Sequence, residues 1–182
     1  MIVAVSGVAG SGKDTFSDYL VVDHGFCRLA LADPLKRFCQ EVFGFTDRQL
    51  WGPSEARSET ALGSTVTARR ALQTLGTDWG RALDEDMWAK MGARIARQKS
   101  DAGKRVVVTD VRFANELAAL QREGAITVRV RREAAGLRGL EAEHVSEREQ
   151  LAIADGSFDF VVDNDGPLAE LREWAARVAR CR

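Results

Sequence analysis

The sequence has few of the residues that hold disulfide-rich or metal-dependent proteins together. Its 182 residues include 3 cysteines and 2 histidines. Cys27, Cys39 and Cys181 are odd in number and are not spaced as metal ligands, which indicates reduced thiols and a cytoplasmic location. His24 has no second candidate ligand near it in the sequence, so we interpret it as a helix-end residue rather than a ligand.

The sequence also lacks a long apolar run, a dominant charge and internal repeats. No segment approaches the roughly 20 apolar residues that span a bilayer. The short apolar run at the N-terminus leads directly into a glycine-rich turn, unlike a signal peptide, so we expect no membrane partner. A net charge of -1 disfavours a nucleic-acid partner, because binding to that backbone usually needs several cationic contacts. The length predicts one domain, residues 1–182.

The most informative stretch follows the apolar run from Ile2 to Val5. Gly7, Gly12 and Lys13 match the G-x-x-x-x-G-K (Walker A) pattern of a phosphate-binding loop. Glycines let several N–H groups surround an anion, and a helix starting at Lys13 would aim its positive dipole end at the same place. The alternative is a turn that only connects two elements. This alternative is disfavoured because the strand, the loop, the lysine and the helix all fit the pattern of a phosphate-binding loop.

The two residues after Lys13 refine this prediction. Asp14 lies in the first helical turn, where the dipole favours a carboxylate, yet it would repel incoming phosphates unless magnesium intervenes. Thr15 is the better candidate for a contact with phosphate or Mg²⁺. An ending of Gly-Lys-x-Thr is more typical of nucleoside monophosphate kinases than of GTPases or motor ATPases.

Apolar segments alternate with helical patterns along the rest of the chain. We predict strands at residues 2–5, 26–31, 106–108, 125–130 and 158–162. Strands separated by helices imply an α/β fold, a five-stranded parallel sheet with helices on both faces. The phosphate loop after the first strand places the ligand at the carboxyl edge of that sheet. Asp110, expected just past the third strand, is suited to hold magnesium through water.

Two excursions are predicted over the same edge. The first, residues 34–82, begins with Asp33 as a helix cap and Pro34 at the first helical position. Lys36 lies in that helix's first turn, against the dipole, so it either faces solvent or points at a second anion. The second excursion, residues 131–146, is charged and contains glycines. It is either a mobile flap or a solvated loop.

Six short motifs in order extend over nearly the whole chain. They are Gly7 to Thr15, Asp33-Pro-Leu-Lys36, Arg69-x-x-Leu-Gln73-x-x-Gly-Thr77, Asp110-Val-Arg-Phe-x-Asn-Glu116, His144-x-Ser-Glu147 and Asn164-Asp-Gly166. The ordered set resembles the phage-type deoxynucleoside monophosphate kinases. This resemblance implies a three-layer P-loop NTPase fold, with residues 34–82 as a helical acceptor-binding insertion and residues 131–146 as a small lid. For a phage-encoded enzyme it also implies the host cytoplasm.

The resemblance further implies transfer of the γ-phosphoryl group of ATP to a deoxynucleoside monophosphate, with Mg²⁺ as cofactor. The acceptor phosphate is already anionic, so the reaction needs alignment and charge neutralisation rather than a general base. The implied catalytic residues are Lys13, Arg112, Arg131 and Arg138. The implied ATP-binding residues are Gly7, Gly10, Ser11, Gly12, Lys13, Asp14, Thr15, Asn164 and Gly166. The implied acceptor-binding residues are Lys36, Arg69, Gln73 and Arg81, and the implied metal ligands are Thr15 and Asp110.

Several alternatives stay open on the sequence. Arg112 either neutralises charge in the transition state or braces Asp110, and Asn164 to Gly166 either borders the adenine or forms an ordinary Asx-type turn. The same fold could act on hydroxymethylated bases in DNA or on dephospho-coenzyme A. A protein of another class would bind ATP as a regulatory module without kinase activity. Base preference, exclusion of ribose and homodimer formation are undetermined by the sequence.

Overall fold

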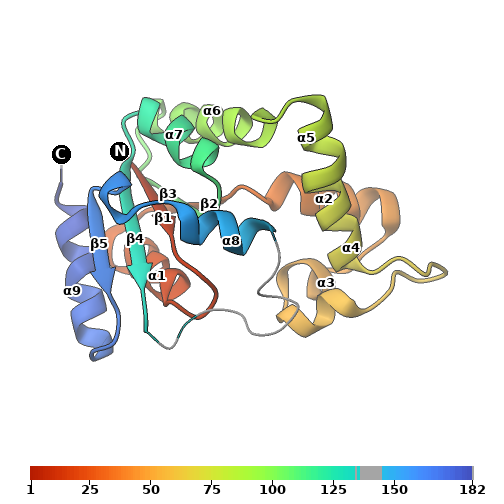
Figure 1. The fold of residues 1–182 in the computed structure, drawn as a ribbon, viewed down its shortest axis with the longest axis horizontal. Helices are drawn as coiled ribbons and strands as arrows, with labels where there is room; N and C mark the ends of the chain where they lie inside the picture. Colours follow the sequence, from red (N-terminus) through yellow and green to blue (C-terminus); the bar gives the residue numbers. More distant parts are fainter. Residues whose placement is uncertain (134, 136–144, 182) are drawn as a thin grey trace. The chain divides into compact units, whose positions relative to one another are not determined.

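Five parallel strands form the sheet that the sequence predicted. The computed structural model describes residues 1–133, 135 and 145–181, and the strand order in it is β2-β3-β1-β4-β5 (Figure 1). The strands are β1 (Ile2–Ser6), β2 (Cys27–Ala30), β3 (Val106–Val111), β4 (Ile126–Arg131) and β5 (Phe160–Asp163). Each overlaps its predicted segment, and β3 continues to Val111 rather than ending at Val108.

The chain divides into two compact units. The first contains Met1–Leu31 and Ala89–Arg182, and the second is the continuous stretch Ala32–Trp88. The helices of the first unit are α1 (Lys13–His24), α6 (Met87–Asp101, whose first two residues fall in the second unit), α7 (Ala114–Arg122), α8 (Val145–Ala152) and α9 (Leu168–Ala179). None of the helices in the described part of the chain is long and apolar enough to cross a membrane.

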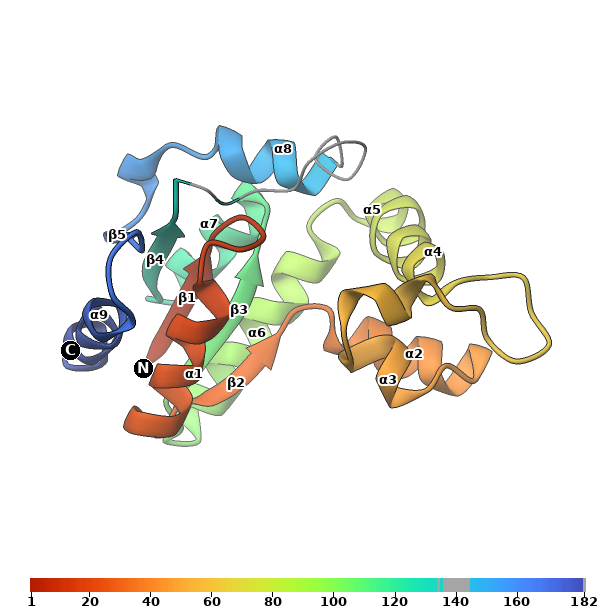
Figure 2. The same ribbon diagram turned by 90° about the horizontal axis from the view of Figure 1, so that it is seen from below.

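Helices cover both faces of the sheet. Successive strand residues point to opposite sides, so a strand that is apolar throughout needs a packing partner on each face. In β1, Ile2 and Ala4 belong to a buried cluster that includes residues of α6 and α7. Val3 and Val5 belong to a second cluster, shared with α1 and α9. Figure 2 shows α1 on one side of the strands and α6 and α7 on the other. The predicted three-layer α/β fold is confirmed.

The second unit is helical and has a core of its own. Its elements are α2 (Asp33–Phe43), α3 (Asp47–Trp51), a 3₁₀ helix (Ser54–Ser58), α4 (Ala68–Gln73), a π-helix (Thr74–Trp79) and α5 (Gly80–Leu83). Its buried core residues are Cys39, Phe45, Leu50, Ala61, Ala68 and Ala71. Leu72 and Leu75 are partly buried and pack against this cluster. The predicted insertion, residues 34–82, falls inside this unit.

One local prediction in the second unit was wrong. Asp33 is the first residue of α2 rather than its cap, and its carboxylate instead accepts a hydrogen bond from Trp51 Nε1 at 3.2 Å and lies 4.0 Å from Lys36 Nζ. A π-helical turn follows α4. The Trp88 indole donates to the carbonyl of Gly76 in that turn at 2.8 Å, so a tertiary contact satisfies part of its backbone.

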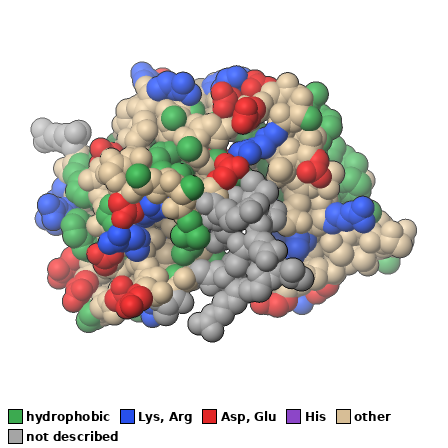
Figure 3. Space-filling view, viewed as in Figure 1, with side chains coloured by type: hydrophobic (Ala, Val, Ile, Leu, Met, Phe, Trp, Pro, Cys, Tyr) green, Lys and Arg blue, Asp and Glu red, His purple; other side chains and the backbone are tan. Residues whose placement is uncertain are grey.

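Charges on the surface are mixed in sign. On the face shown in Figure 3, Lys and Arg side chains are interspersed with Asp and Glu side chains. This distribution agrees with the net charge of -1 and gives that face no continuous basic surface.

Candidate functional site

The segment between β1 and α1 adopts a conformation that requires glycine at two positions. Gly7 has φ 155°, and a Cβ there would lie 2.5 Å from the carbonyl oxygen of Val130 in β4. Gly12 has φ 97° at the N-cap of α1, and a Cβ there would lie 2.2 Å from Nδ2 of Asn164. A larger residue at either position would meet both strain and a steric clash. The loop is therefore shaped by close approach of β4 and of the turn after β5.

This loop presents hydrogen-bond donors that suit an anion. The N–H groups of the first turn of α1 have no acceptor within the helix, and the helix dipole is positive there. The Ser11 hydroxyl oxygen is buried and has no hydrogen-bond partner among the described residues. Such a group is costly to leave unpaired, so the cradle fits a ligand with acceptor oxygens.

Lys13 and Asp14 form an ion pair beside this cradle. The distance from Lys13 Nζ to Asp14 Oδ2 is 3.7 Å, and the side chains are 12% and 70% exposed. Asp14 thus gives the half-buried ammonium a counter-charge, which offers a physical reason for a carboxylate directly after the lysine. An incoming phosphate would compete with Asp14 for the same cation.

Asn164 holds the backbone of the loop between β1 and α1. Its side chain is buried, and Nδ2 donates to the carbonyl of Ser11 at 2.9 Å. The sequence predicted Asn164 and Gly166 at the adenine of ATP. The structure shows that Asn164 holds the loop backbone, while Gly166 is exposed on the turn before α9. Contact with adenine stays a prediction for both residues.

Asp110 is inside β3 rather than just past its end, which corrects the predicted position. Its φ is 70°, the only positive value among the described non-glycine residues. The pairing of β1 with β3 shifts register at this point. A carboxylate in this strained conformation at the carboxyl edge of the sheet is typical of a functional position.

Arg112 grips Asp110 with two hydrogen bonds. Nε donates to Oδ1 at 2.9 Å and Nη2 donates to Oδ2 at 3.0 Å. Of the two roles that the sequence left open for Arg112, bracing Asp110 is the one that this geometry displays.

Thr15, the other predicted metal ligand, is half-buried in the first turn of α1. Among the described residues, no group of three or more His, Cys, Asp or Glu side chains is arranged to hold a metal ion.

Glu116 has a buried carboxyl group next to the backbone that follows β3. It lies in one of the six sequence motifs, but the sequence indicated no role for it. Its Oε2 accepts hydrogen bonds from the backbone N–H groups of Arg112 at 2.9 Å and Phe113 at 3.1 Å. Burial raises the pKa of Glu116 to about 7, even though these two hydrogen bonds act in the opposite direction. The carboxyl group therefore fixes the backbone that follows Asp110.

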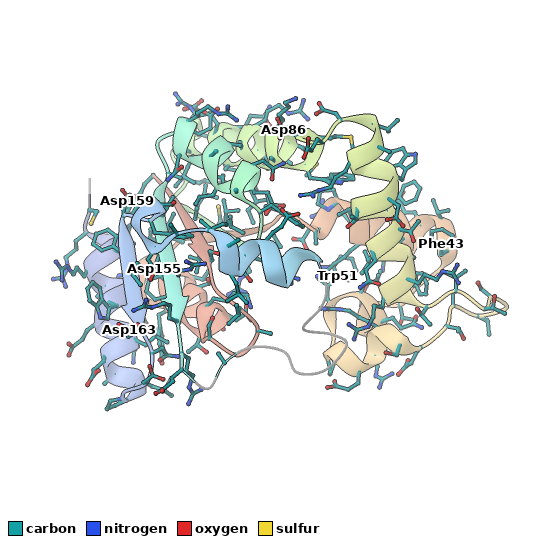
Figure 4. All side chains as sticks on the ribbon, in the orientation of Figure 1. Phe43, Trp51, Asp86, Asp155, Asp159 and Asp163 are labelled. Atoms are coloured by element: carbon teal, nitrogen blue, oxygen red, sulfur yellow. The ribbon has the colours of Figure 1, made fainter. Side chains whose placement is uncertain are left out.

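Arg131 lies at the end of β4, which corrects its predicted place on the flap. Its Nε donates to Asp163 Oδ1 at 2.8 Å, and its Nη1 donates to Asp155 Oδ2 at 2.5 Å; both aspartates are labelled in Figure 4. The hydrogen bond to Asp163, together with the charge of Asp155, raises the pKa of Arg131. These ion pairs join β4, β5 and the turn before β5. A catalytic role for Arg131 stays a prediction, and Arg138 lies outside the described residues.

Each predicted acceptor-binding residue lies on a helix of the second unit. Lys36 is half-buried in the first turn of α2, and its ammonium lies 5.7 Å from the ring centroid of Trp51. Arg69 and Gln73 are four residues apart on α4, so they share one helical face. Arg81 is half-buried on α5. The unit thus carries three cations and one amide on α2, α4 and α5.

Comparison with known proteins identifies the family. A sequence model described as deoxynucleotide monophosphate kinase matches residues 54–174, more than half of the chain. The chain belongs to the deoxynucleotide monophosphate kinase family. This kinase chain is 29% identical over 185 residues to a protein of Acanthamoeba polyphaga mimivirus that carries the name "Putative deoxynucleotide monophosphate kinase". The alignment covers 93% of the chain and 91% of the viral protein.

Solved structures of other proteins share the fold of this kinase chain. Thermus thermophilus TT1252 matches with a TM-score of 0.55 at 19% identity, covering 100% of the chain and 98% of that protein. Campylobacter jejuni dephospho-CoA kinase matches with a TM-score of 0.53 at 15% identity, covering 97% and 94%. A sugar kinase from Janibacter sp. HTCC2649 gives 0.53 at 19%, covering 97% and 92%. At these identities the likeness establishes the α/β kinase fold alone.

Proposed function

We propose that this chain is a deoxynucleoside monophosphate kinase, which transfers the γ-phosphoryl group of ATP to a deoxynucleoside monophosphate and yields the diphosphate and ADP. The observation that carries the proposal is the loop between β1 and α1. Its buried Ser11 hydroxyl has no partner in the part of the chain that the structure describes, and its Lys13 pairs with the exposed carboxylate of Asp14. In a chain of this family, that loop is suited to the phosphates of a nucleotide donor.

The first unit would bind the donor. The loop N–H groups, Ser11 and Lys13 contact the β- and γ-phosphates, and Asp14 gives up its ion pair with the lysine. The Thr15 hydroxyl is a suitable ligand for Mg²⁺, which takes oxygen ligands and keeps several waters. Both oxygens of Asp110 accept hydrogen bonds from Arg112, so we place Asp110 on the metal through water. Bound Mg²⁺ would neutralise charge on the transferred group.

The second unit would bind the acceptor. Lys36 and Arg69 supply cations for the acceptor phosphate, and Gln73, on the same face of α4 as Arg69, supplies an amide for the base. Arg81 adds a further cation. An ATP-binding regulatory module would have no use for this group, which favours a two-substrate enzyme. Asp155 and Asp163 hold Arg131 at the end of β4, so we keep closure over the phosphates only for Arg138, which lies outside the described residues.

An acceptor panel tests the proposal. ADP formation would be measured with ATP and Mg²⁺ and each of the deoxynucleoside monophosphates, the ribonucleoside monophosphates, dephospho-coenzyme A and hydroxymethylated DNA. We expect turnover to depend strongly on at least one deoxynucleoside monophosphate. Turnover of ATP that no monophosphate changes would contradict the proposal. Turnover with dephospho-coenzyme A or DNA alone would keep the kinase and replace the acceptor.

A pair of α4 variants tests the assignment of the acceptor site. Arg69→Ala should raise the KM for the deoxynucleoside monophosphate by about 10- to 100-fold, the loss expected for a charge-assisted hydrogen bond, and change the KM for ATP little. Arg70→Ala is the matched control, because Arg70 is the next residue of α4 and its side chain is exposed. Equal losses with both substrates in Arg69→Ala would place this arginine in the donor site or in the fold.

A further inference from the structure

Gln150 of α8 brings a buried amide to the base of the phosphate loop. The residue is 1% exposed. Its Nε2 lies 3.1 Å from the carbonyl oxygen of Gly7, 3.1 Å from that of Val111 and 3.2 Å from Oγ of Ser6. The Ser6 hydroxyl in turn donates to the Val111 carbonyl at 2.7 Å. One side chain thus joins the end of β1, the end of β3 and α8.

The two carbonyl groups that Gln150 contacts belong to functional segments. Gly7 is the first glycine of the phosphate loop, so holding its oxygen fixes the peptide plane through which the loop leaves β1. Val111 directly follows Asp110. The peptide between Val111 and Arg112 is held at both ends, because Gln150 and Ser6 contact its oxygen while Glu116 accepts its N–H.

The backbone of Gln150 is itself anchored. Arg129 of β4 is 8% exposed and donates to the carbonyl oxygens of Gln150 and Ile153, at the C-terminal end of α8. The same guanidinium pairs with Asp155 at 2.7 Å and lies 4.9 Å from the ring centroid of Phe158. A side chain that is fixed from its own backbone can hold other groups with little loss of order.

We infer that Gln150 is a positioning residue for phosphoryl transfer. Its amide holds the carbonyl groups of Gly7 and Val111 at a fixed separation. The donor phosphates on the loop and the Asp110 carboxylate are thereby kept at a fixed distance from each other. The inference rests on the proposed function for its catalytic consequence. The positioning itself is a property of the backbone and can be measured without turnover. No sequence pattern indicates this role, since residues 147–150 are all polar.

Gln150→Met removes the donor and keeps the length of the side chain. We expect kcat/KM for ATP to fall about tenfold or more, while the KM for the acceptor changes less than about twofold. Hydrogen exchange resolved to peptides should become faster over residues 7–13 and 109–113. The matched control is Gln121→Met, because Gln121 of α7 also donates to a backbone carbonyl, that of Ser157 at 2.8 Å, and is exposed. This control should leave kcat/KM and exchange in both segments unchanged.

Two further variants separate positioning from general destabilisation. Gln150→Asn keeps the donor but shortens the side chain, so it should show the same losses even if Gln150→Met fails to fold. Ser6→Ala should add little to the loss in Gln150→Met, since both belong to one network. Unchanged exchange in residues 7–13 and 109–113 of a folded Gln150 variant would overturn the inference, as would unchanged kcat/KM in an active enzyme. If the wild-type protein binds no ATP while the Gln150 variants show faster exchange, the proposed function is refuted and the positioning role stands.

Discussion

Replacing Glu116 by glutamine should change how the stability of the protein depends on pH. The carboxyl group has an ordinary pKa of 4.5, and burial raises it to about 7 in the folded protein. A folded state with the higher pKa binds its proton more tightly than the unfolded chain. The free energy of unfolding must therefore decrease as pH rises from about 4.5 to about 7, and change no further from this group above that range.

The size of the effect follows from the difference between the two pKa values. A shift from 4.5 to about 7 is about 2.5 units. At about 1.4 kcal/mol per unit, ionised Glu116 destabilises the fold by about 3 kcal/mol relative to the protonated form. Glutamine keeps an oxygen that can accept from the N–H groups of Arg112 and Phe113, and it carries no charge. The free energy of unfolding of Glu116→Gln, minus that of the wild type, should thus rise by about 3 kcal/mol between pH 4.5 and pH 7.5.

Urea unfolding at half-unit steps of pH measures this difference directly. The quantity to plot is the free energy of unfolding of Glu116→Gln minus that of the wild type. Glu173→Gln, an exposed carboxylate on α9, is the control and should give a flat line. A difference for Glu116→Gln that stays constant within about 0.5 kcal/mol across this range would refute the reasoning. A difference that falls with pH would show that the carboxylate is stabilised as an anion.

Two other substitutions have matched controls in the chain. Gly12→Ala should abolish ATP binding and lower the free energy of unfolding by about 1–3 kcal/mol in calorimetry, because its Cβ would clash with Asn164. Gly10→Ala, where φ is 78° and no atom of the described residues lies within 4 Å of a Cβ, should cost less, and equal losses would contradict the clash. Arg129→Met should lower the free energy of unfolding in urea by about 3 kcal/mol, because it removes a buried guanidinium that donates to two backbone carbonyls and to Asp155. Arg28→Met, whose ion pair with Asp18 is exposed, should cost at most about 1 kcal/mol, and similar costs would mean that burial of the guanidinium is unimportant.

The sheet could be predicted because burial on both faces leaves a plain pattern. Val106 to Val108 are all fully buried, and a run of β-branched residues satisfies both sides of a parallel strand. The glycine-rich loop after β1 could also be predicted, since Gly7 and Gly12 have positive φ values that favour glycine. Both features depend on neighbours in the sequence or on one residue type, so no long-range information was needed.

The predictions that failed depend on tertiary partners. The Asp33 carboxylate was predicted to cap α2, but it accepts a hydrogen bond from the indole of Trp51 instead. Arg131 was assigned to the flap because it follows a strand, whereas Asp155 and Asp163 hold it within the sheet edge. Gln150 sits in a polar segment and becomes a core residue only through the fold. Such positions have no signature in a single sequence, because their partners lie far along the chain.

The continuous stretch Ala32–Trp88 has a hydrophobic core separate from that of the sheet. It leaves the first unit after β2 and returns through α6, so the chain crosses between the units only twice. All proposed donor residues belong to one unit and all proposed acceptor residues to the other. Evolution could therefore exchange or reshape the insertion as a module, altering which substrate is phosphorylated while the proposed donor residues are inherited unchanged.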